Sequence, residues 1–456
     1  MSVASETVPA RETHVFPRLV HLDYPNVASA EGVWLTLAGS GRRILDGCSG
    51  GAMTACLGHS DAAVIEAAAA QARELSYTYN HHFTNEPQER LAERLVAEAA
   101  PAMARVRFTS GGSEANETAL RLIRGYHVER GDSERWRIVA PAQAYHGSLT
   151  GALALSGRRS LRERWDPYLS RHLHLPPMPW REDPTGEQAL AALDRLLEEA
   201  GPETVAAYFC EPVTAAALPG FAPPEAFWRG LDERRREHGF LICCDEIVSG
   251  MGRTGSWFAS DRLPFAPDIV TAGKGLGAGY APIAAVLCTQ AVYDALERGS
   301  GEFDHGHTWD GAPLPCAVGS AVLEQIASRA LVTRVDARGP RLRDQLQDAL
   351  RDLASVREVR GRGYLLGVEL VDPRDGASPL PDALDVERIV TEAALGRDLL
   401  LAATSTAADG YVGDQVLLAP AYTMSDDELD ALVACTAAAL GDAERAIERA
   451  LAGAPA

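Results

Sequence analysis

Lysine occurs once in this chain of 456 residues, at position 274. The other basic residues, 42 of the 43, are arginines, so the chain has dispensed with lysine wherever arginine serves. Arginine cannot replace a lysine that must lose its proton, because the guanidinium stays charged and forms no imine at neutral pH. A desolvated lysine amine can act as a nucleophile or base. Lys274 is therefore the first candidate for a catalytic residue, although one lysine could also survive by chance.

Two acidic residues, Asp245 and Glu246, follow the apolar run Phe240 to Cys244. Lys274 follows the next apolar run, 29 residues after Asp245. Ligands in α/β sheets bind at the carboxyl ends of parallel strands, so adjacent strand ends could present an acid and an amine to one pocket. Alternatively, Asp245 has a purely structural role.

A glycine-rich turn, Ser110 to Ala115, follows the apolar run Val106 to Thr109 and opens a helical pattern. Free N–H groups and the helix dipole attract anions at such a point; Gly112 lets a phosphate approach the backbone and Ser113 adds a hydroxyl. An ordinary glycine turn with a serine cap is the competing interpretation. Because no lysine follows these glycines, the turn is not a Walker A loop.

The elements that must position these residues alternate along the chain. From about residue 62, stretches with helical periodicity separate short apolar runs, and this alternation predicts a mainly parallel sheet flanked by helices. Beyond about residue 305 the pattern becomes α+β, and residues 32–46 read as a hairpin. We expect an α/β protein with a large domain over residues 62–304 and a smaller α+β domain formed by residues 1–61 and 305–456.

Composition excludes several classes of function. A formal net charge of −20 disfavours nucleic acid as a partner. Residues 1–19 lack the apolar core of a signal peptide, and no apolar stretch is long enough to span a membrane. The eight scattered cysteines have no CxxC spacing for a zinc or redox site. These features predict a cytoplasmic protein with reduced thiols and no metal.

Several motifs in order resemble the class III aminotransferases of pyridoxal-phosphate (PLP) fold type I. The acidic pair is followed by Gly-x-Gly-Arg-Thr-Gly, then by Pro-Asp-Ile and a strand that ends in Gly-Lys-Gly. Further motifs extend the resemblance over nearly the whole chain: Ser110 to Ala115, Tyr145-His146-Gly147, Glu211-Pro212-Val213, His307-Thr308-Trp309 and Arg360 to Leu370.

The resemblance implies the cofactor PLP and a role for each matching residue. Lys274 would hold PLP as a Schiff base and shuttle the proton, and Asp245 would keep the pyridine nitrogen protonated. Tyr145 and Ile247 would cover the two faces of the ring, and Glu211 would be an outer acceptor or structural. The phosphate would be bound by Gly112 and Ser113 and by Thr308 of a neighbouring subunit, which implies a homodimer.

The implied activity is transfer of an amino group between an amine or amino acid and an aldehyde, ketone or oxo acid, by a ping-pong mechanism. An aminomutase of the semialdehyde type, a PLP-dependent decarboxylase and a PLP-bearing regulatory protein share the cofactor motifs. The glutamate–arginine pair of many relatives is missing, since Thr214 to Ala216 follow the Glu-Pro pair and residues 399–416 contain no arginine. Residues 407–414 instead resemble a subgroup called ω-transaminases. A substrate pocket of that kind could be lined in this chain by His81, His82, Phe83 and Trp309.

Overall fold

The computed structural model describes residues 7–8, 13–405 and 413–453. Its centre is a seven-stranded sheet in the order β6-β12-β11-β10-β9-β7-β8. All neighbours run parallel except β12, which is antiparallel to both β11 and β6. The strands are β6 (Met103–Thr109), β7 (Arg137–Pro141), β8 (Leu173–Leu175), β9 (Val205–Cys210), β10 (Leu241–Glu246), β11 (Ile269–Ala272) and β12 (Ala284–Thr289).

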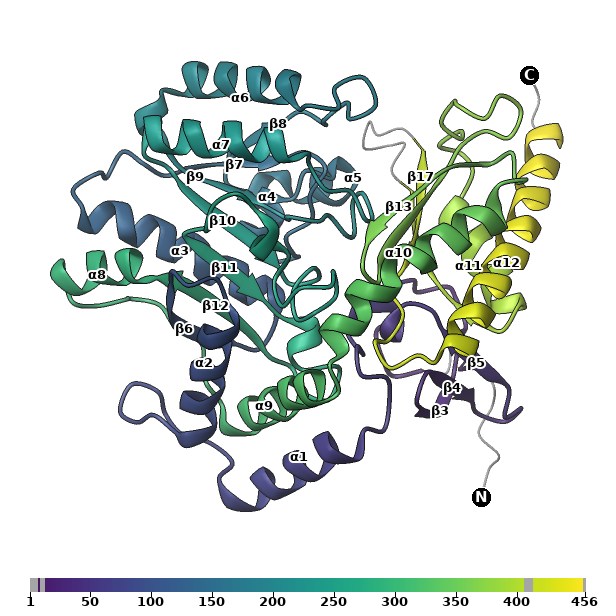
Figure 1. Ribbon diagram of the computed structural model, residues 1–456, viewed down its shortest axis with the longest axis horizontal. Helices are drawn as coiled ribbons and strands as arrows, with labels where there is room; N and C mark the ends of the chain where they lie inside the picture. The colour runs from purple at the N-terminus through teal and green to yellow at the C-terminus, as the bar shows by residue number, and fades with distance from the viewer. Residues whose placement is uncertain (1–6, 9–12, 406–412, 454–456) are drawn as a thin grey trace.

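Helices cover both faces of this sheet, as the continuous apolar strands predict. Alternate residues of β10 point to opposite sides: Leu241 and Cys243 pack with α3 and α8, and Ile242 and Cys244 with the cluster that includes α6 and α7. Figure 1 shows α6 and α7 together on one side. These helices are α3 (Gly112–Glu129), α6 (Glu187–Ala200), α7 (Glu225–His238) and α8 (Gln290–Arg298). The expected α/β fold with a mainly parallel sheet is confirmed.

Shorter elements complete the large part of the molecule. Helices α1 (Ala62–Glu74) and α2 (Glu86–Glu98) both pack on α9 (Pro313–Ser328), and α2 also contacts the edge strand β6. Asp61 caps α1 by accepting two of its first N–H groups, and Asn85 caps α2. Helices α4 (Thr150–Leu155) and α5 (Arg159–Arg162) follow β7.

The rest of the described chain forms two four-stranded sheets covered by helices and one two-stranded antiparallel pair, β1 with β2. One has the order β13-β14-β17-β16, and the other has the order β15-β5-β4-β3. In the second, β15 pairs in parallel with β5, and Leu399 lies opposite Leu45. The two ends of the chain therefore share a sheet, while the domain limits given above remain predictions. The elements are β1 (Thr7–Val8), β2 (Tyr24–Pro25), β3 (Val27–Glu31), β4 (Trp34–Leu37), β5 (Arg43–Asp46), α10 (Leu331–Leu350), β13 (Val356–Arg362), β14 (Leu365–Leu370), α11 (Val386–Gly396), β15 (Leu399–Leu400), β16 (Ala402–Thr404), β17 (Asp414–Leu418) and α12 (Asp426–Gly453).

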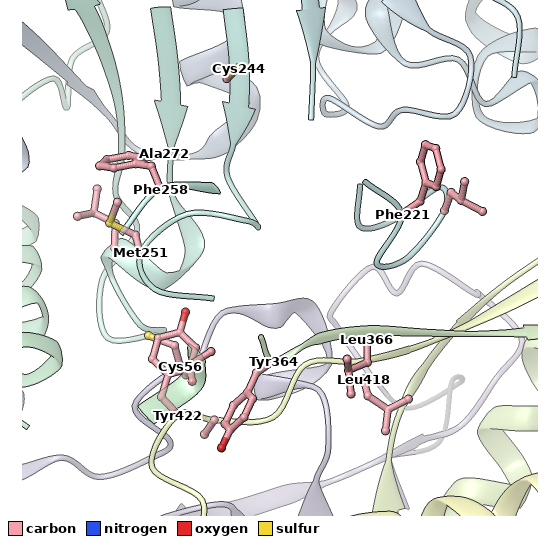
Figure 2. Close-up of a cluster of buried hydrophobic side chains, with 14 of the residues drawn as sticks. Cys56, Phe221, Cys244, Met251, Phe258, Ala272, Tyr364, Leu366, Leu418 and Tyr422 are labelled. Carbon is pink, nitrogen blue, oxygen red and sulfur yellow. The ribbon is translucent and has the colours of Figure 1, made fainter. Parts of the chain in front are cut away.

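One apolar cluster joins these parts. Figure 2 shows Met251 of the large part together with Cys56, Tyr364 and Tyr422. Tyr364 and Tyr422 are among the largest fully buried side chains. Because burial of such rings contributes strongly to stability, we expect the two parts to unfold together rather than separately. None of the helices in the described part of the chain combines the length and the apolar character that a membrane span needs.

Candidate active site

Lys274 follows β11 after one glycine, Gly273, and begins a short 3-10 turn, Lys274–Leu276. Its φ of 41° is in the left-handed region, which is uncommon for a residue with a side chain. Burial lowers the pKa of its amine, against the opposing effect of the nearby Cys48, Glu211 and Asp245. A lysine in this environment more readily supplies the neutral amine that a nucleophile or base requires.

Asp245 lies in β10, one strand from Lys274. It stands opposite Thr271 in the parallel pairing of β10 with β11, so the acid and the amine come from adjoining strand ends, as the sequence predicts. The side chain is 4% exposed. Its Oδ2 accepts hydrogen bonds from His146 Nδ1 at 2.7 Å and Asn116 Nδ2 at 2.8 Å, and its Oδ1 accepts one from the Ile247 amide at 3.0 Å. These bonds stabilise a buried carboxylate and fix its direction.

Asn116 and His146 are site residues that the sequence did not reveal. Asn116 is on α3; it also donates to the His146 carbonyl at 2.6 Å and accepts from Thr271 Oγ1 at 2.8 Å. His146 is buried, and its ring meets Phe209 edge-on at 4.9 Å between centroids. Although His146 is part of the Tyr-His-Gly motif, nothing local indicates that its ring reaches a strand end 99 residues away.

The glycine turn forms an open helix N-terminus. The amides of Gly112, Ser113 and Glu114 donate to no acceptor within the described chain. A Cβ on Gly112 would lie 2.9 Å from Ile247 Cγ2, so only glycine fits between that side chain and the helix start. Ser113 Oγ accepts from the Ser148 amide at 3.0 Å. The arrangement can bind a phosphate dianion through backbone N–H groups.

Tyr145 and Glu211 meet beside this cradle. The Tyr145 amide donates to Glu211 Oε2 at 3.1 Å, and the Ala215 amide donates to Glu211 Oε1 at 3.1 Å. Burial raises the pKa of Glu211 to about 7. The Tyr145 hydroxyl lies 3.0 Å from Ser148 Oγ. Glu211 therefore holds the backbone of the loop that carries Tyr145. Its position is outside the first layer of residues around the site.

Arg253 is a third residue whose role the sequence did not reveal, although it is part of the Gly-x-Gly-Arg-Thr-Gly motif. It is fully buried and donates to the carbonyls of Tyr364 at 3.3 Å and Pro420 at 2.6 Å, and to Ser49 Oγ at 3.1 Å. Its guanidinium also lies 4.7 Å from the ring centre of Tyr422. Arg253 thereby fastens both terminal segments of the chain beside Lys274.

Other residues singled out in the sequence lie on the surface. Thr308 is on an exposed turn and makes no hydrogen bond to the groups around Lys274 in the part of the chain that the structure describes. Phe83 is 67% exposed and Trp309 59%. His81 stacks on Tyr79 at 4.8 Å, and His82 contacts the same ring edge-on. Most of the segment 407–414, on which the ω-transaminase resemblance depends, lies outside the described residues.

Taken together, the lysine, the buried carboxylate and the anion cradle fit PLP. Asp245 would face the pyridine nitrogen, and the amides of residues 112–114 would bind the phosphate. Lys274 would face the aldehyde. Tyr145 and Ile247 would lie on the two faces of the ring. The sheet with these groups at its strand ends defines a PLP-dependent enzyme of fold type I.

Comparison with known proteins identifies the family. The class III aminotransferase model matches residues 19–440. An uncharacterised aminotransferase of Bacillus subtilis, YodT, is 31% identical over 93% of this chain and 97% of its own length. A diaminobutyrate–2-oxoglutarate transaminase of Halomonas elongata is 33% identical, covering 90% of this chain and 88% of the relative. The chain belongs to the class III aminotransferases, which use PLP.

A solved structure agrees with this assignment. An amine transaminase from an uncultivated Pseudomonas species, in its PLP-bound form, superposes with a TM-score of 0.84 at 31% identity. The match covers 97% of this chain and 98% of that one. The resemblance inferred from the motifs is therefore confirmed in fold, family and cofactor.

Proposed function

We propose that this enzyme is a transaminase of the ω type, which moves an amino group between an amine or amino acid and an aldehyde, ketone or oxo acid by a ping-pong mechanism. The observation that carries the proposal is the placement of Lys274 and Asp245 at adjoining strand ends beside an open helix N-terminus. The names of the relatives support it: one acts on diaminobutyrate and 2-oxoglutarate, and one solved neighbour is an amine transaminase.

Bound PLP supplies an aldehyde that takes up the amino group and a pyridine ring that accepts an electron pair. The residues of this chain bind, orient and move protons around it. Lys274 would hold the cofactor until the substrate amine displaces it and would then carry a proton to and from the substrate carbon. Asp245, held by His146 and Asn116, would keep a proton on the ring nitrogen. Tyr145, half-buried above the cradle, would keep water from one face.

Aminomutation and decarboxylation remain the alternatives to test, because they need the same cofactor residues. An assay with a panel of amines, and with pyruvate or 2-oxoglutarate as acceptor, separates the three reactions. Amino transfer predicts that turnover requires both a donor and an acceptor, with parallel lines in double-reciprocal plots. Turnover without an acceptor would support the aminomutase, and release of carbon dioxide the decarboxylase.

We also propose a homodimer with shared active sites. Tyr79, Phe83 and Trp309 are exposed, Trp309 adjoins Thr308 and meets the ring of Tyr77 edge-on at 5.7 Å, and aromatic residues are enriched in protein interfaces. Thr308 would bind the phosphate held by the other chain. Light scattering gives the mass in solution. Mixing Lys274→Ala chains with Thr308→Ala chains, at a PLP concentration that leaves the Thr308→Ala parent largely unloaded, tests the sharing: about a quarter of the wild-type activity at that concentration should return, since random exchange makes half of the dimers mixed, each with one intact site.

A cytoplasmic location is proposed on the chemistry of the thiols. All eight cysteines are free, and all except Cys435 are buried. Such thiols are usual in a reducing compartment. Cell fractionation with an antibody to the native chain checks this location.

A further inference from the structure

The turn that bears Thr308 is exposed at its tip and buried at its base. Thr308 is exposed, and the next residue, Trp309, is 59% exposed. Asp310, two residues after Thr308, is only 4% exposed. A surface turn that serves only as a connection has no need of a buried carboxylate, because desolvating that charge costs free energy.

An arginine from the edge strand β6 holds both sides of the turn. Arg107 Nε donates to Asp310 Oδ2 at 3.1 Å, and its Nη2 lies 2.9 Å from the same oxygen. Nη2 also donates to the His305 carbonyl at 2.6 Å. The His307 amide donates to Asp310 Oδ2 at 3.0 Å. The Arg107 guanidinium and the Asp310 carboxylate therefore hold the turn on both sides of Thr308.

The backbone is fitted closely around this ion pair. A Cβ on Gly306 would lie 2.8 Å from Arg107 Nη2 and 3.4 Å from Asp310 Oδ2. Two further contacts hold the ends of the turn: His305 Nε2 lies 2.9 Å from Thr118 Oγ1, and Asn85 Nδ2 donates to the Gly311 carbonyl at 2.9 Å. The anchors come from β6, α3 and the start of α2, so the tip has little freedom relative to the large sheet.

We propose that Arg107 and Asp310 are positioning residues, which hold the turn 305–311 so that the Thr308 hydroxyl reaches the phosphate bound by a second copy of the chain. This inference rests on the proposed shared-site dimer. Neither residue touches the site of its own chain through any contact found among the described residues; the effect acts through Thr308. Asp310 Oδ1 is buried and has no hydrogen-bond partner among those residues, so this oxygen is desolvated without a compensating bond inside the chain.

The test uses the dimer itself and measures cofactor affinity as well as activity. Arg107→Met and Asp310→Ala should each weaken PLP binding about tenfold, the effect of losing one well-placed hydrogen bond to a charged group. Thr308→Ala should weaken it similarly. The double variant Thr308→Ala/Asp310→Ala should bind PLP as Thr308→Ala does, because both changes remove the same contact.

Subunit mixing locates the defect. If Arg107 acts through the other chain's site, Arg107→Met mixed with Lys274→Ala chains should recover activity, measured at a PLP concentration that leaves Arg107→Met largely unloaded. A defect confined to its own site would leave both sites of the mixed dimer damaged, and no activity would return. The control is Arg298→Met, which breaks an exposed Arg298–Asp294 pair on α8 and should leave PLP affinity unchanged.

The outcomes separate the two proposals. Failure of Thr308→Ala to complement Lys274→Ala, with subunit exchange demonstrated, would overturn the shared site and this inference with it. Complementation by Thr308→Ala but not by Arg107→Met, or unchanged PLP affinity in both positioning variants, would overturn this inference alone. Should Arg107→Met not fold, Asp310→Asn, which keeps the shape of the side chain and removes its charge, carries the same test.

Discussion

His146 Nδ1 lies 2.7 Å from Asp245 Oδ2, and both side chains are buried. The His146 ring thus orients Asp245, the acid that is expected to face the pyridine nitrogen. His146→Phe should keep the ring volume and remove the donor, leaving Asp245 Oδ2 with one fewer partner at a cost of about 1–3 kcal/mol. We expect a loss of kcat of about tenfold and a displaced pH profile. His146→Asn, which can still donate, should recover part of both; equal behaviour of the two variants would contradict the role.

Asp245→Asn should fold and bind PLP but lose at least about 100-fold in kcat, because an amide does not favour a protonated ring nitrogen. Steady-state kinetics with saturating PLP measure the loss. Circular dichroism verifies that the variant is folded. Turnover close to that of the wild type would show that the carboxylate is structural.

Lys274→Arg should retain the positive charge and abolish turnover, because arginine does not give up its proton at neutral pH. The wild-type protein should be yellow, and borohydride treatment followed by peptide mass spectrometry should place the reduced cofactor on the peptide that contains Lys274. Since this is the chain's only lysine, a label on any other peptide, or activity in the variant, would contradict its assignment.

Gly112→Ala should weaken PLP binding by about 10- to 100-fold, because the added methyl would lie 2.9 Å from Ile247 Cγ2 and displace the helix start from the phosphate. Gly111→Ala is the matched control. Its φ of −168° is extended, and a Cβ there would meet nothing within 4 Å. Fluorescence titration of both apoproteins with PLP compares the affinities, and the same affinity in both variants would argue against the cradle.

Glu246 should make the stability of the fold depend on pH. Burial raises its pKa from the usual 4.5 to about 7. Between pH 4.5 and about 7 the folded state therefore keeps a proton that the unfolded chain has lost. The stabilisation that Glu246 contributes is fully present below pH 4.5 and is lost as the pH rises through about 7. The free energy of unfolding should fall by up to about 3 kcal/mol over that range from this residue. Urea unfolding of wild type and Glu246→Gln at several pH values compares the slopes, which should be smaller in the variant; equal slopes would contradict the assignment.

The local sequence was sufficient to predict the reactive groups that each lie on a single strand end or helix start. A unique lysine after an apolar strand, an acid after the preceding strand and glycines before a helix each act through their own backbone neighbourhood. Because parallel strands end at the same edge of a sheet, the meeting of Asp245 and Lys274 could also be predicted. The strands and helices followed from hydrophobic periodicity for the same reason: the period depends only on the local backbone.

Only the tertiary structure decided which distant side chains complete the site. His146 reaches Asp245 across 99 residues, Arg253 joins the carbonyls of Tyr364 and Pro420, and Arg107 meets Asp310 across 203 residues. Each contact depends on strand order and on how a loop crosses the sheet, and neither is encoded in the spacing of residues along one element. The sequence by itself therefore determined the reactive groups and the cofactor class, while packing determined how those groups are oriented.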